Sequence, residues 1–392
     1  MEIVGIICEY NPFHNGHIYH IKKIKKLYPE SLIILVMSGN FLQRGEASLI
    51  NKWDKTKIAL KFGVNLVVEL PFHFATQAAD IFARGAIKIL NELGVTKIVF
   101  GTECNDISYL TEVAKLQLYN PDYQLKVKEF LDTGVNYPTA LSRAIRFFNL
   151  KNVTKPNDIL GLAYIKEILL QNPNIEPVSI KRTTDYHSKI LNHKMASATS
   201  IRIALDNYID ITPYVPKITL KYLNSEMRLE KFFPLLRYKI ISEIDSLDRY
   251  QTVDEGIENK IKKEIYKCIN VQDLVERLKC RRYTQNRIQR MLIHILCGFT
   301  KEEALKYSNI YYIRILGFDI PGREYLNKIK KDLKLKLISN YSSSKGMLDL
   351  EYRVNAIYAS VLDDSKKFEL TSLELKSTPI IKKIIVDNIK DT

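Results

Sequence analysis

The stretch IVGIICEYNPFHNGHIYH, residues 3–20, decides the fold of this chain. Its first six residues are apolar without polar alternation, which is typical of a strand buried on both faces of a parallel sheet. After a loop, Ile18, Ile21 and Ile24 recur with helical spacing, and lysines occupy the opposite face. The stretch therefore predicts a strand, a loop and a helix, the first unit of an α/β domain.

Similar apolar runs recur about 30 residues apart and predict further strands. With the first, these predicted strands cover residues 3–8, 32–37, 66–68 and 98–100. Residues 78–93 follow the helical period, and a later helix is expected from Asn157 to Leu170, with Asn157 or Asp158 as its N-cap. A strand is expected at residues 178–181. This alternation predicts a doubly wound parallel sheet of the α/β class.

The rhythm of strands and helices stops after Arg202. Residues 213–307 have the pattern of amphipathic helices, one of which begins with a T-x-x-E capping box at Thr300 and Glu303. The second half of the chain is therefore expected to be mainly helical.

Residues 310–318 and 333–338 predict a small mixed unit near the C-terminus. We expect two domains, an α/β domain at residues 1–210 and a mainly helical, basic domain at residues 211–392, with prolines marking the boundary. The excess charge is concentrated late, because residues 251–350 carry 20 basic and 12 acidic side chains. Such a surface suits a polyanionic partner.

The composition excludes several other classes of protein. The chain has 392 residues and a formal net charge of +15, and its 46% hydrophobic content is that of an ordinary globular protein. Its five cysteines are dispersed and form no C-x-x-C pair, which argues against a disulfide framework and a structural zinc site. Glu2 and Glu9 interrupt any signal peptide, and no apolar run is long enough to cross a bilayer. We expect a cytoplasmic protein with no membrane association.

His14, Gly16 and His17 lie where the first predicted strand gives way to the first helix. Ligands bind at this edge of an open parallel sheet, and a helix start offers free N–H groups to an anion. Two histidines beside a glycine could donate hydrogen bonds to one phosphate and stabilise its transition state. A single helix-start histidine is more often only a cap. A metal site that includes His20 is a further alternative.

Other candidate residues follow later strands. Arg44 is expected to face either the site or Glu46 in a salt bridge, and Gly101 would leave room for a nucleotide. Asn157 is a cap candidate whose amide also suits a nucleotide, and Arg182 suits a phosphate or ribose.

A turn rich in serine and threonine, Ser197 to Arg202, offers either a simple helix cap or a phosphate site in which Arg202 binds the anion. With the H-x-G-H element, this turn resembles the two signatures of the nucleotidyltransferase superfamily, which includes class I aminoacyl-tRNA synthetases and adenylyltransferases. The chain has neither the lysine loop of the synthetases nor a Walker motif.

The chain is more specifically similar to the tRNA(Met) cytidine acetate ligase family. The blocks that carry this resemblance are GIICEYNPFHNGH, MSGNFLQRGEAS, NLVVELPF, QAADIFARGA, FGTE, KPNDILGLAY, IKR and SATSIR. The resemblance implies an ATP-binding catalytic domain that activates acetate as acetyl-adenylate and acetylates N4 of the wobble cytidine of elongator tRNA(Met). It implies ATP as a substrate, with Mg2+ expected to accompany it.

The resemblance also implies the site residues. The catalytic pair would be His14 and His17. The ATP contacts would be Ile7, Cys8, Glu9, Tyr10, Asn11, Pro12, Phe13, His14, Asn15, Gly16, His17, Ile18, Tyr19, His20, Gly101, Asn157, Arg182, Ser200 and Arg202.

A basic cluster around Tyr283 is the leading candidate for tRNA contact, since RNA affinity comes largely from neutralised phosphates. Its arginines are Arg277, Arg281, Arg282, Arg287 and Arg290. A solvated basic face is the alternative, and the lysines at 328–336 are a weaker second candidate. A small-molecule adenylyltransferase and a non-catalytic RNA-binding protein remain alternative functions. The expected partners are tRNA and acetate, and no protein partner is evident.

Overall fold

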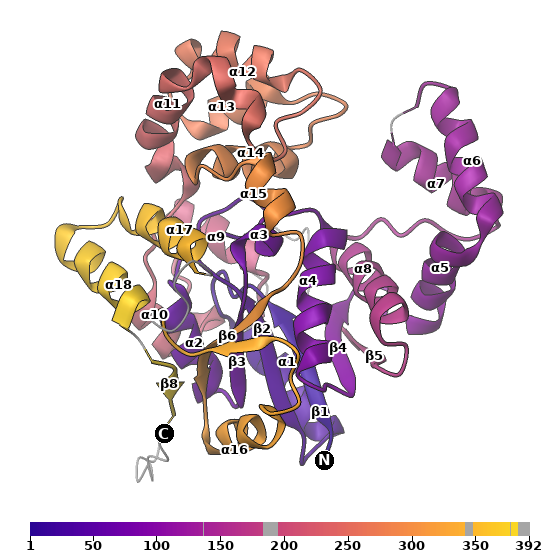
Figure 1. The fold of residues 1–392 in the computed structure, drawn as a ribbon, viewed down its shortest axis with the longest axis vertical. Coiled ribbons are helices and arrows are strands. Elements are labelled where there is room, and N and C mark those ends of the chain that lie inside the picture. Colours follow the sequence, from indigo (N-terminus) through magenta and orange to yellow (C-terminus); the bar gives the residue numbers. More distant parts are fainter. Residues whose placement is uncertain (136, 183–194, 342–347, 377, 383–392) are drawn as a thin grey trace.

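The computed structural model describes residues 1–135, 137–182, 195–341, 348–376 and 378–382 (Figure 1). Its strands are β1 (Ile3–Cys8), β2 (Leu32–Ser38), β3 (Leu66–Leu70), β4 (Lys97–Thr102), β5 (Glu176–Lys181), β6 (Tyr312–Phe318), β7 (Lys336–Ile338) and β8 (Ile380–Ile381). Its first helices are α1 (Asn15–Leu27), α2 (Lys52–Lys61), α3 (Phe72–Ala75), α4 (Ala79–Glu92), α5 (Ile107–Tyr119), α6 (Pro121–Asp132), α7 (Tyr137–Phe147), α8 (Pro156–Gln171) and α9 (Ala198–Asp206). The later helices are α10 (Lys217–Tyr222), α11 (Phe233–Ser242), α12 (Ile257–Glu264), α13 (Val271–Leu278), α14 (Gln285–Leu296), α15 (Lys301–Lys306), α16 (Ile320–Ile329), α17 (Asp349–Ala359) and α18 (Asp364–Lys376). Short 3-10 segments are η1 (Thr212–Tyr214), η2 (Leu229–Phe232), η3 (Ile244–Arg249) and η4 (Ile265–Lys267).

The strands form one sheet in the order β5-β4-β1-β2-β3-β6-β7, and β8 pairs with β6. The strands from β5 to β3 are parallel. The chain moves outward from β1 through β2 to β3 and then crosses to β4 on the other side of β1, so its winding direction reverses between β1 and β4. The predicted doubly wound fold is confirmed, and this reversal is the place where such sheets bind ligands.

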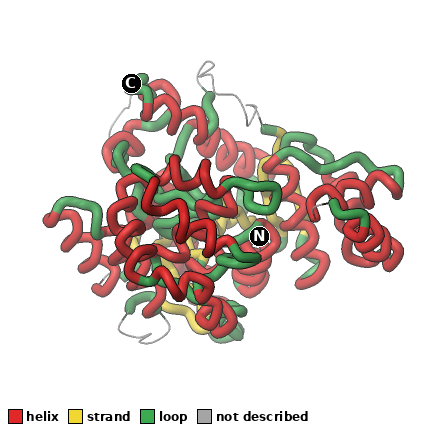
Figure 2. The backbone as a smooth tube through the Cα atoms, turned by 90° about the horizontal axis from the view of Figure 1, so that it is seen from above, coloured by secondary structure: helices red, strands yellow, loops and turns green. Residues whose placement is uncertain are grey.

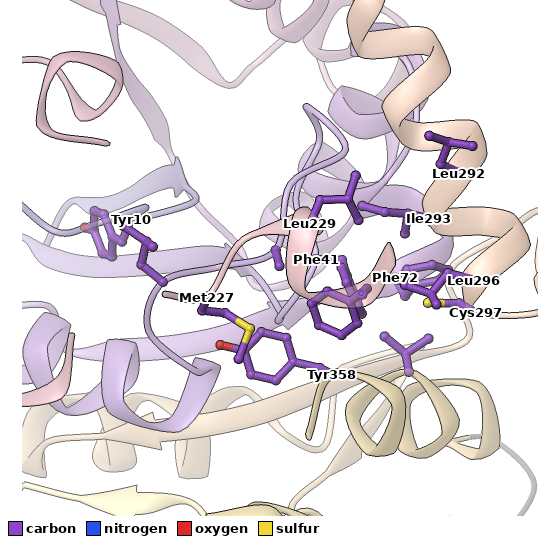
Figure 3. Packing of buried hydrophobic residues seen from close by; sticks show 14 of the residues in the cluster. Tyr10, Phe41, Phe72, Met227, Leu229, Leu292, Ile293, Leu296, Cys297 and Tyr358 are labelled. Carbon is purple, nitrogen blue, oxygen red and sulfur yellow. The ribbon is translucent and has the colours of Figure 1, made fainter. Parts of the chain in front are cut away.

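The central strands have both faces covered, as their apolar runs predict. Along β2, Ile33 and Leu35 pack in one core with α1 and α2, whereas Ile34 and Val36 pack in a second core with α4 and α8. Figure 2 shows helices on both sides of the strands. The first core continues into the helices of the second half of the chain, where Phe41 and its neighbours meet α14 and α17 (Figure 3).

The predicted mixed unit near the C-terminus is wrong as a separate unit, because its strands extend the central sheet. β6 pairs antiparallel with β3, and β7 and β8 pair with β6. The apolar run of β6 is explained by burial on both faces, because Leu316 packs in the first core whereas Ile313 and Ile315 pack in the second. The division near residue 210 stays a prediction about separate roles, but the sheet itself crosses it.

A buried cluster of four charged side chains joins β6 to the rest of the sheet. Arg314 of β6 contacts Glu69 of β3 at 3.4 Å and also pairs with Glu374 of α18. Lys52 of α2 completes the cluster at 2.8 Å from Glu69 and 3.0 Å from Glu374. All four side chains are at most 3% exposed. Each buried charge has an opposite partner, which burial in a low-dielectric interior demands.

A second buried lysine on the same helix holds the strand ends. The Lys55 ammonium donates to the carbonyl oxygens of Glu9, Ser38 and Gly39 at 2.8–3.0 Å. Burial lowers the pKa of Lys55 to about 7. The carboxyl ends of β1 and β2 are thereby fixed to α2.

Two local expectations differ from the structure. The N-cap of α8 is Lys155, not Asn157 or Asp158, because both of those side chains face the loop after β4. Helices α5, α6 and α7 follow β4 without a strand: α5 packs in the second core beside α8, and α6 and α7 extend away from the sheet at the upper right of Figure 1, an excursion that no pattern of the sequence indicated. The capping box of Thr300 and Glu303 at the start of α15 is confirmed.

We predict that Arg314→Met lowers the free energy of unfolding by about 3–5 kcal/mol, since it leaves two buried carboxylates facing one lysine. Urea denaturation at pH 7 measures this. The control is Lys57→Met, which breaks the exposed pair with Asp54 and should cost less than about 1 kcal/mol. Equal losses in the two variants would contradict the importance of the buried cluster.

Candidate active site

A pocket of about 490 Å3 lies at the carboxyl ends of β1, β4 and β5, beside the start of α1. It is therefore at the reversal point of the sheet. The predicted site residues that line it are Ile7, Cys8, Glu9, Tyr10, Asn11, His14, Gly16, His17, Tyr19, His20, Gly101, Asn157, Arg182 and Arg202. The structure thus brings together segments separated by nearly two hundred positions.

His14 and His17 cap α1 reciprocally. Nδ1 of His14 accepts a hydrogen bond from the N–H of Gly16 at 3.0 Å, and Nδ1 of His17 accepts one from the N–H of His14 at 3.1 Å. A neutral imidazole that accepts at Nδ1 carries its proton at Nε2. The two histidines can therefore cap the helix and bind a ligand at the same time, since each ring keeps an Nε2–H donor.

The three histidines of this segment are held neutral. Burial, with smaller contributions from Arg182 and Arg202, lowers the pKa of His14 to about 3. Burial lowers the pKa of His20 to about 4, and burial and His14 lower that of His17. At pH 7 the rings are hydrogen-bond donors without charge, and the arginines supply the positive field of the pocket.

Arg182 supplies a cation at the end of β5. Its side chain passes Gly101, whose hypothetical Cβ would lie 3.3 Å from Cγ of Arg182. A larger residue at Gly101 would crowd the arginine, which gives this glycine a steric role. The buried Nε of Arg182 has no partner among the described residues, and burial lowers its pKa. An anion in the pocket would satisfy this group.

Arg202 is already engaged within the protein. Its guanidinium donates to the backbone oxygen of Asn11 at 2.8 Å and pairs with Glu46 at 3.2 Å. Glu46 also accepts from the side chain of Asn11 at 3.2 Å. Of the two alternatives for Arg44, the structure places it in the lining of the pocket, and the salt bridge of Glu46 is with Arg202. Arg202 holds the loop after β1 to α9.

Five residues of the predicted set do not line the pocket. Phe13 is wholly buried in the first core, and Asn15 donates to the backbone of Pro213. Ser200 is buried and forms a reciprocal cap with Ser197, which agrees with the simple helix-cap interpretation of that turn. The others are Pro12 and Ile18.

Sequence reasoning missed the apolar wall of the pocket. This wall is formed by side chains from α4, β4, β5 and α8, namely Ala79, Phe82, Phe100, Ile159, Leu160, Tyr164 and Ile180. Several of them were recognised as members of strands or helices, but periodicity indicates only that a residue is buried, not that it borders a cavity. Gln43 and Asn286 also line the pocket, and Asn286 comes from α14 in the helical half.

The basic cluster is not uniform. Arg281 and Arg282 are exposed, whereas Arg277 pairs with Asp273 at 2.8 Å and Arg287 stacks over Tyr283 at 4.0 Å. Arg290 is half-buried and donates to the backbone oxygen of Gln43 at 3.1 Å. Arg290 therefore joins α14 to a loop that borders the pocket.

Metal and membrane alternatives find no support in the described part of the chain. There, no three histidine, cysteine, aspartate or glutamate side chains are arranged to hold a metal ion, the triplet that ends at His20 included. Within the same residues, no helix has the length and apolar character to span a bilayer.

Known proteins are similar to this chain over nearly its whole length. The model of the HIGH Nucleotidyl Transferase family matches residues 1–372. The chain is 40% identical to a Geobacillus protein named tRNA(Met) cytidine acetate ligase, over 97% of this chain and 100% of that one. A protein of the same name from Caldicellulosiruptor bescii is 39% identical over 97% and 98% of the two chains.

Solved structures agree with these relatives. The crystal structure of apo Thermotoga maritima TmcAL superposes with a TM-score of 0.89 at 31% identity, over 97% of this chain and 99% of that one. The same protein bound with alpha-thio ATP superposes with a TM-score of 0.87. The chain is a member of the HIGH Nucleotidyl Transferase family, and its fold agrees with that class. Within that class, the chain belongs to the tRNA(Met) cytidine acetate ligase family, and the resemblance seen in its sequence is confirmed.

We predict that His14 and His17 are neutral Nε2–H tautomers at pH 7. Nitrogen-15 NMR of labelled protein distinguishes the two ring nitrogens. Acidification should leave His14 neutral until pH falls toward about 3, because burial and two arginines disfavour its charged form. Titration of both rings near the ordinary value of about 6.5 would contradict this electrostatic arrangement.

Proposed function

We propose that this chain is an ATP-dependent ligase that forms acetyl-adenylate and acetylates N4 of the wobble cytidine of elongator tRNA(Met). The observation that carries the proposal is a pair of imidazoles beside Arg182, in a pocket at the reversal of the sheet, that accept at Nδ1 and have no partner for Nε2 among the described residues. The names of the relatives support the same reaction. The alpha-thio ATP complex of the Thermotoga maritima protein supports ATP as the nucleotide.

In the first step, a carboxylate oxygen of acetate attacks the α-phosphorus of ATP and pyrophosphate leaves. Negative charge develops on the phosphate oxygens, and donors that are already oriented stabilise it without reorganisation. His14 and His17 would donate through Nε2, and Arg182 would pair with a phosphate or ribose oxygen. Acetate is already an anionic nucleophile and requires no general base.

In the second step, the amine of cytidine attacks the acetyl carbonyl, AMP leaves, and the amine loses a proton.

Mg2+ would arrive with the ATP phosphates. The nearby carboxylates are engaged, since Glu9 accepts from the N–H of Gln43 and Glu46 binds Asn11 and Arg202. The phosphates and water would therefore provide most of the ligands of the ion. We place the enzyme in the cytoplasm, together with its tRNA.

We predict that His17→Asn lowers acetate-dependent ATP–pyrophosphate exchange about a hundredfold, because it removes a transition-state donor. The side-chain oxygen of asparagine can replace Nδ1 as the acceptor for the N–H of His14, so stability should change little. The control is His17→Gln, which can place a donor near Nε2 and should retain more activity than His17→Asn. Normal exchange in His17→Asn would contradict the assignment.

We predict that Arg281→Glu combined with Arg282→Glu weakens tRNA binding and reduces its salt dependence, because both cations are exposed beside α14. Acetate-dependent exchange should be retained. Binding titrations at two salt concentrations, with mass spectrometry of the tRNA product, measure the two effects.

The matched control for this charge change is Lys22→Glu combined with Lys26→Glu, on the exposed side of α1. Equal weakening in both pairs would mean that only net charge matters. Unchanged tRNA affinity in the Arg281→Glu, Arg282→Glu variant would mean that the basic cluster is only a solvated surface. Exchange that does not depend on acetate would favour a different small-molecule adenylyltransferase, and absence of any exchange would favour a non-catalytic RNA-binding protein.

A further inference from the structure

The pocket has two chemically different parts. Its histidines and arginines suit the phosphates of a nucleotide, whereas the apolar wall from Phe100 and Leu160 suits the flat face of a base. Asn157 lines the pocket at the start of α8, beside this wall. Its amide can form hydrogen bonds to the edge of a base.

A carboxylate outside the pocket controls the orientation of Asn157. Glu103, in the loop after β4, accepts a hydrogen bond from Nδ2 of Asn157 at 2.6 Å through Oε1. Its Oε2 accepts the backbone N–H of Asp158 at 3.0 Å. Asp158 in turn accepts the N–H groups of Glu103 and Cys104 at 2.8 and 3.1 Å. These hydrogen bonds lock the β4 loop to the start of α8.

This lock fixes the amide of Asn157 in one orientation. A carboxylate only accepts hydrogen bonds, so the nitrogen of the amide must face Glu103 and the oxygen must face the other way. Among the described residues, Oδ1 has no partner. Because Asn157 lines the pocket, this oxygen is an acceptor available to a ligand there.

We propose that Glu103 is a positioning residue that makes the pocket select adenine. An acceptor at Asn157 complements the 6-amine of adenine and opposes the 6-carbonyl of guanine or hypoxanthine. The selectivity arises because the wrong base leaves two acceptors facing each other, which a site built for a hydrogen bond rejects strongly. The inference rests on the proposed use of ATP and identifies how its base is chosen.

The first test is Glu103→Gln, with ATP and inosine triphosphate as nucleotides. The introduced glutamine can keep the N–H of Asp158 through its oxygen and turn its NH2 toward Asn157, which then rotates its own NH2 into the pocket. We expect the ATP-to-inosine triphosphate ratio of binding constants, measured by calorimetry, to fall about tenfold or more. The ratio of kcat/KM values in acetate-dependent exchange should fall in parallel.

The second test restores the acceptor. In Glu103→Gln combined with Asn157→Asp, the amide of the introduced glutamine donates to one oxygen of the new carboxylate while the other oxygen faces the base. The preference for ATP should return toward that of the unmodified protein. The control is Glu112→Gln, an exposed carboxylate of α5 outside the pocket, which should leave the ratio unchanged.

Two outcomes would overturn the proposed role of Glu103, and a third would separate it from the proposed function. A loss of affinity for both nucleotides with an unchanged ratio would mean that Glu103 only stabilises α8, and would overturn the proposal. Failure of the double variant to regain the ratio would also overturn it. Because calorimetry requires neither acetate nor tRNA, selective ATP binding without acetate-dependent exchange would refute the proposed function while supporting this role of Glu103.

Discussion

Two buried lysines on α2, Lys52 and Lys55, hold the structure together around the site. They are three residues apart, so they occupy one side of the helix and both face the sheet. Lys55 binds the carbonyl oxygens at the ends of β1 and β2, and Lys52 binds Glu69 of β3. A single helix thus fixes the carboxyl ends of three parallel strands, the edge at which the pocket lies.

The same constraint connects the two ends of the chain. Lys52 also binds Glu374 of α18, and Arg314 of β6 shares both carboxylates. Without Glu374 and Arg314, the buried ammonium of Lys52 would keep only one charged partner, Glu69. The C-terminal strands therefore contribute to the geometry of a pocket that they do not line. The histidines of the pocket are neutral, so they add hydrogen-bond donors there without adding to the buried charge.

Local sequence patterns predicted the strands that precede the site. The apolar runs located β1, β2, β3 and β4 because a strand buried on both faces is mostly apolar. The run at 66–68 ended before the end of β3, because the next residue is the charged Glu69, which is buried beside Lys52. H-x-G-H and the Ser197–Arg202 turn located both helix starts for the same kind of local reason, since caps depend on residues three positions apart. Long-range pairs were not accessible. Arg202 binds Glu46, 156 positions away, and nothing near Glu46 distinguishes that partner from its neighbour Arg44. Buried lysines were equally hidden, because lysine is normally exposed.

The link between the pocket and the helical half depends on close backbone contact. Gly45 has a φ of +78°, and a Cβ there would lie 2.4 Å from the backbone nitrogen of Arg290 in α14, so only glycine fits. Arg290 was expected to contact tRNA, but it donates to the carbonyl of Gln43 and thereby joins α14 to the pocket. The start of α14 combines both roles, since Asn286 lines the pocket and its neighbour Arg287 belongs to the basic cluster. If tRNA binds to that cluster as proposed, it would lie beside the pocket that Asn286 lines, where a base could reach an activated acyl group.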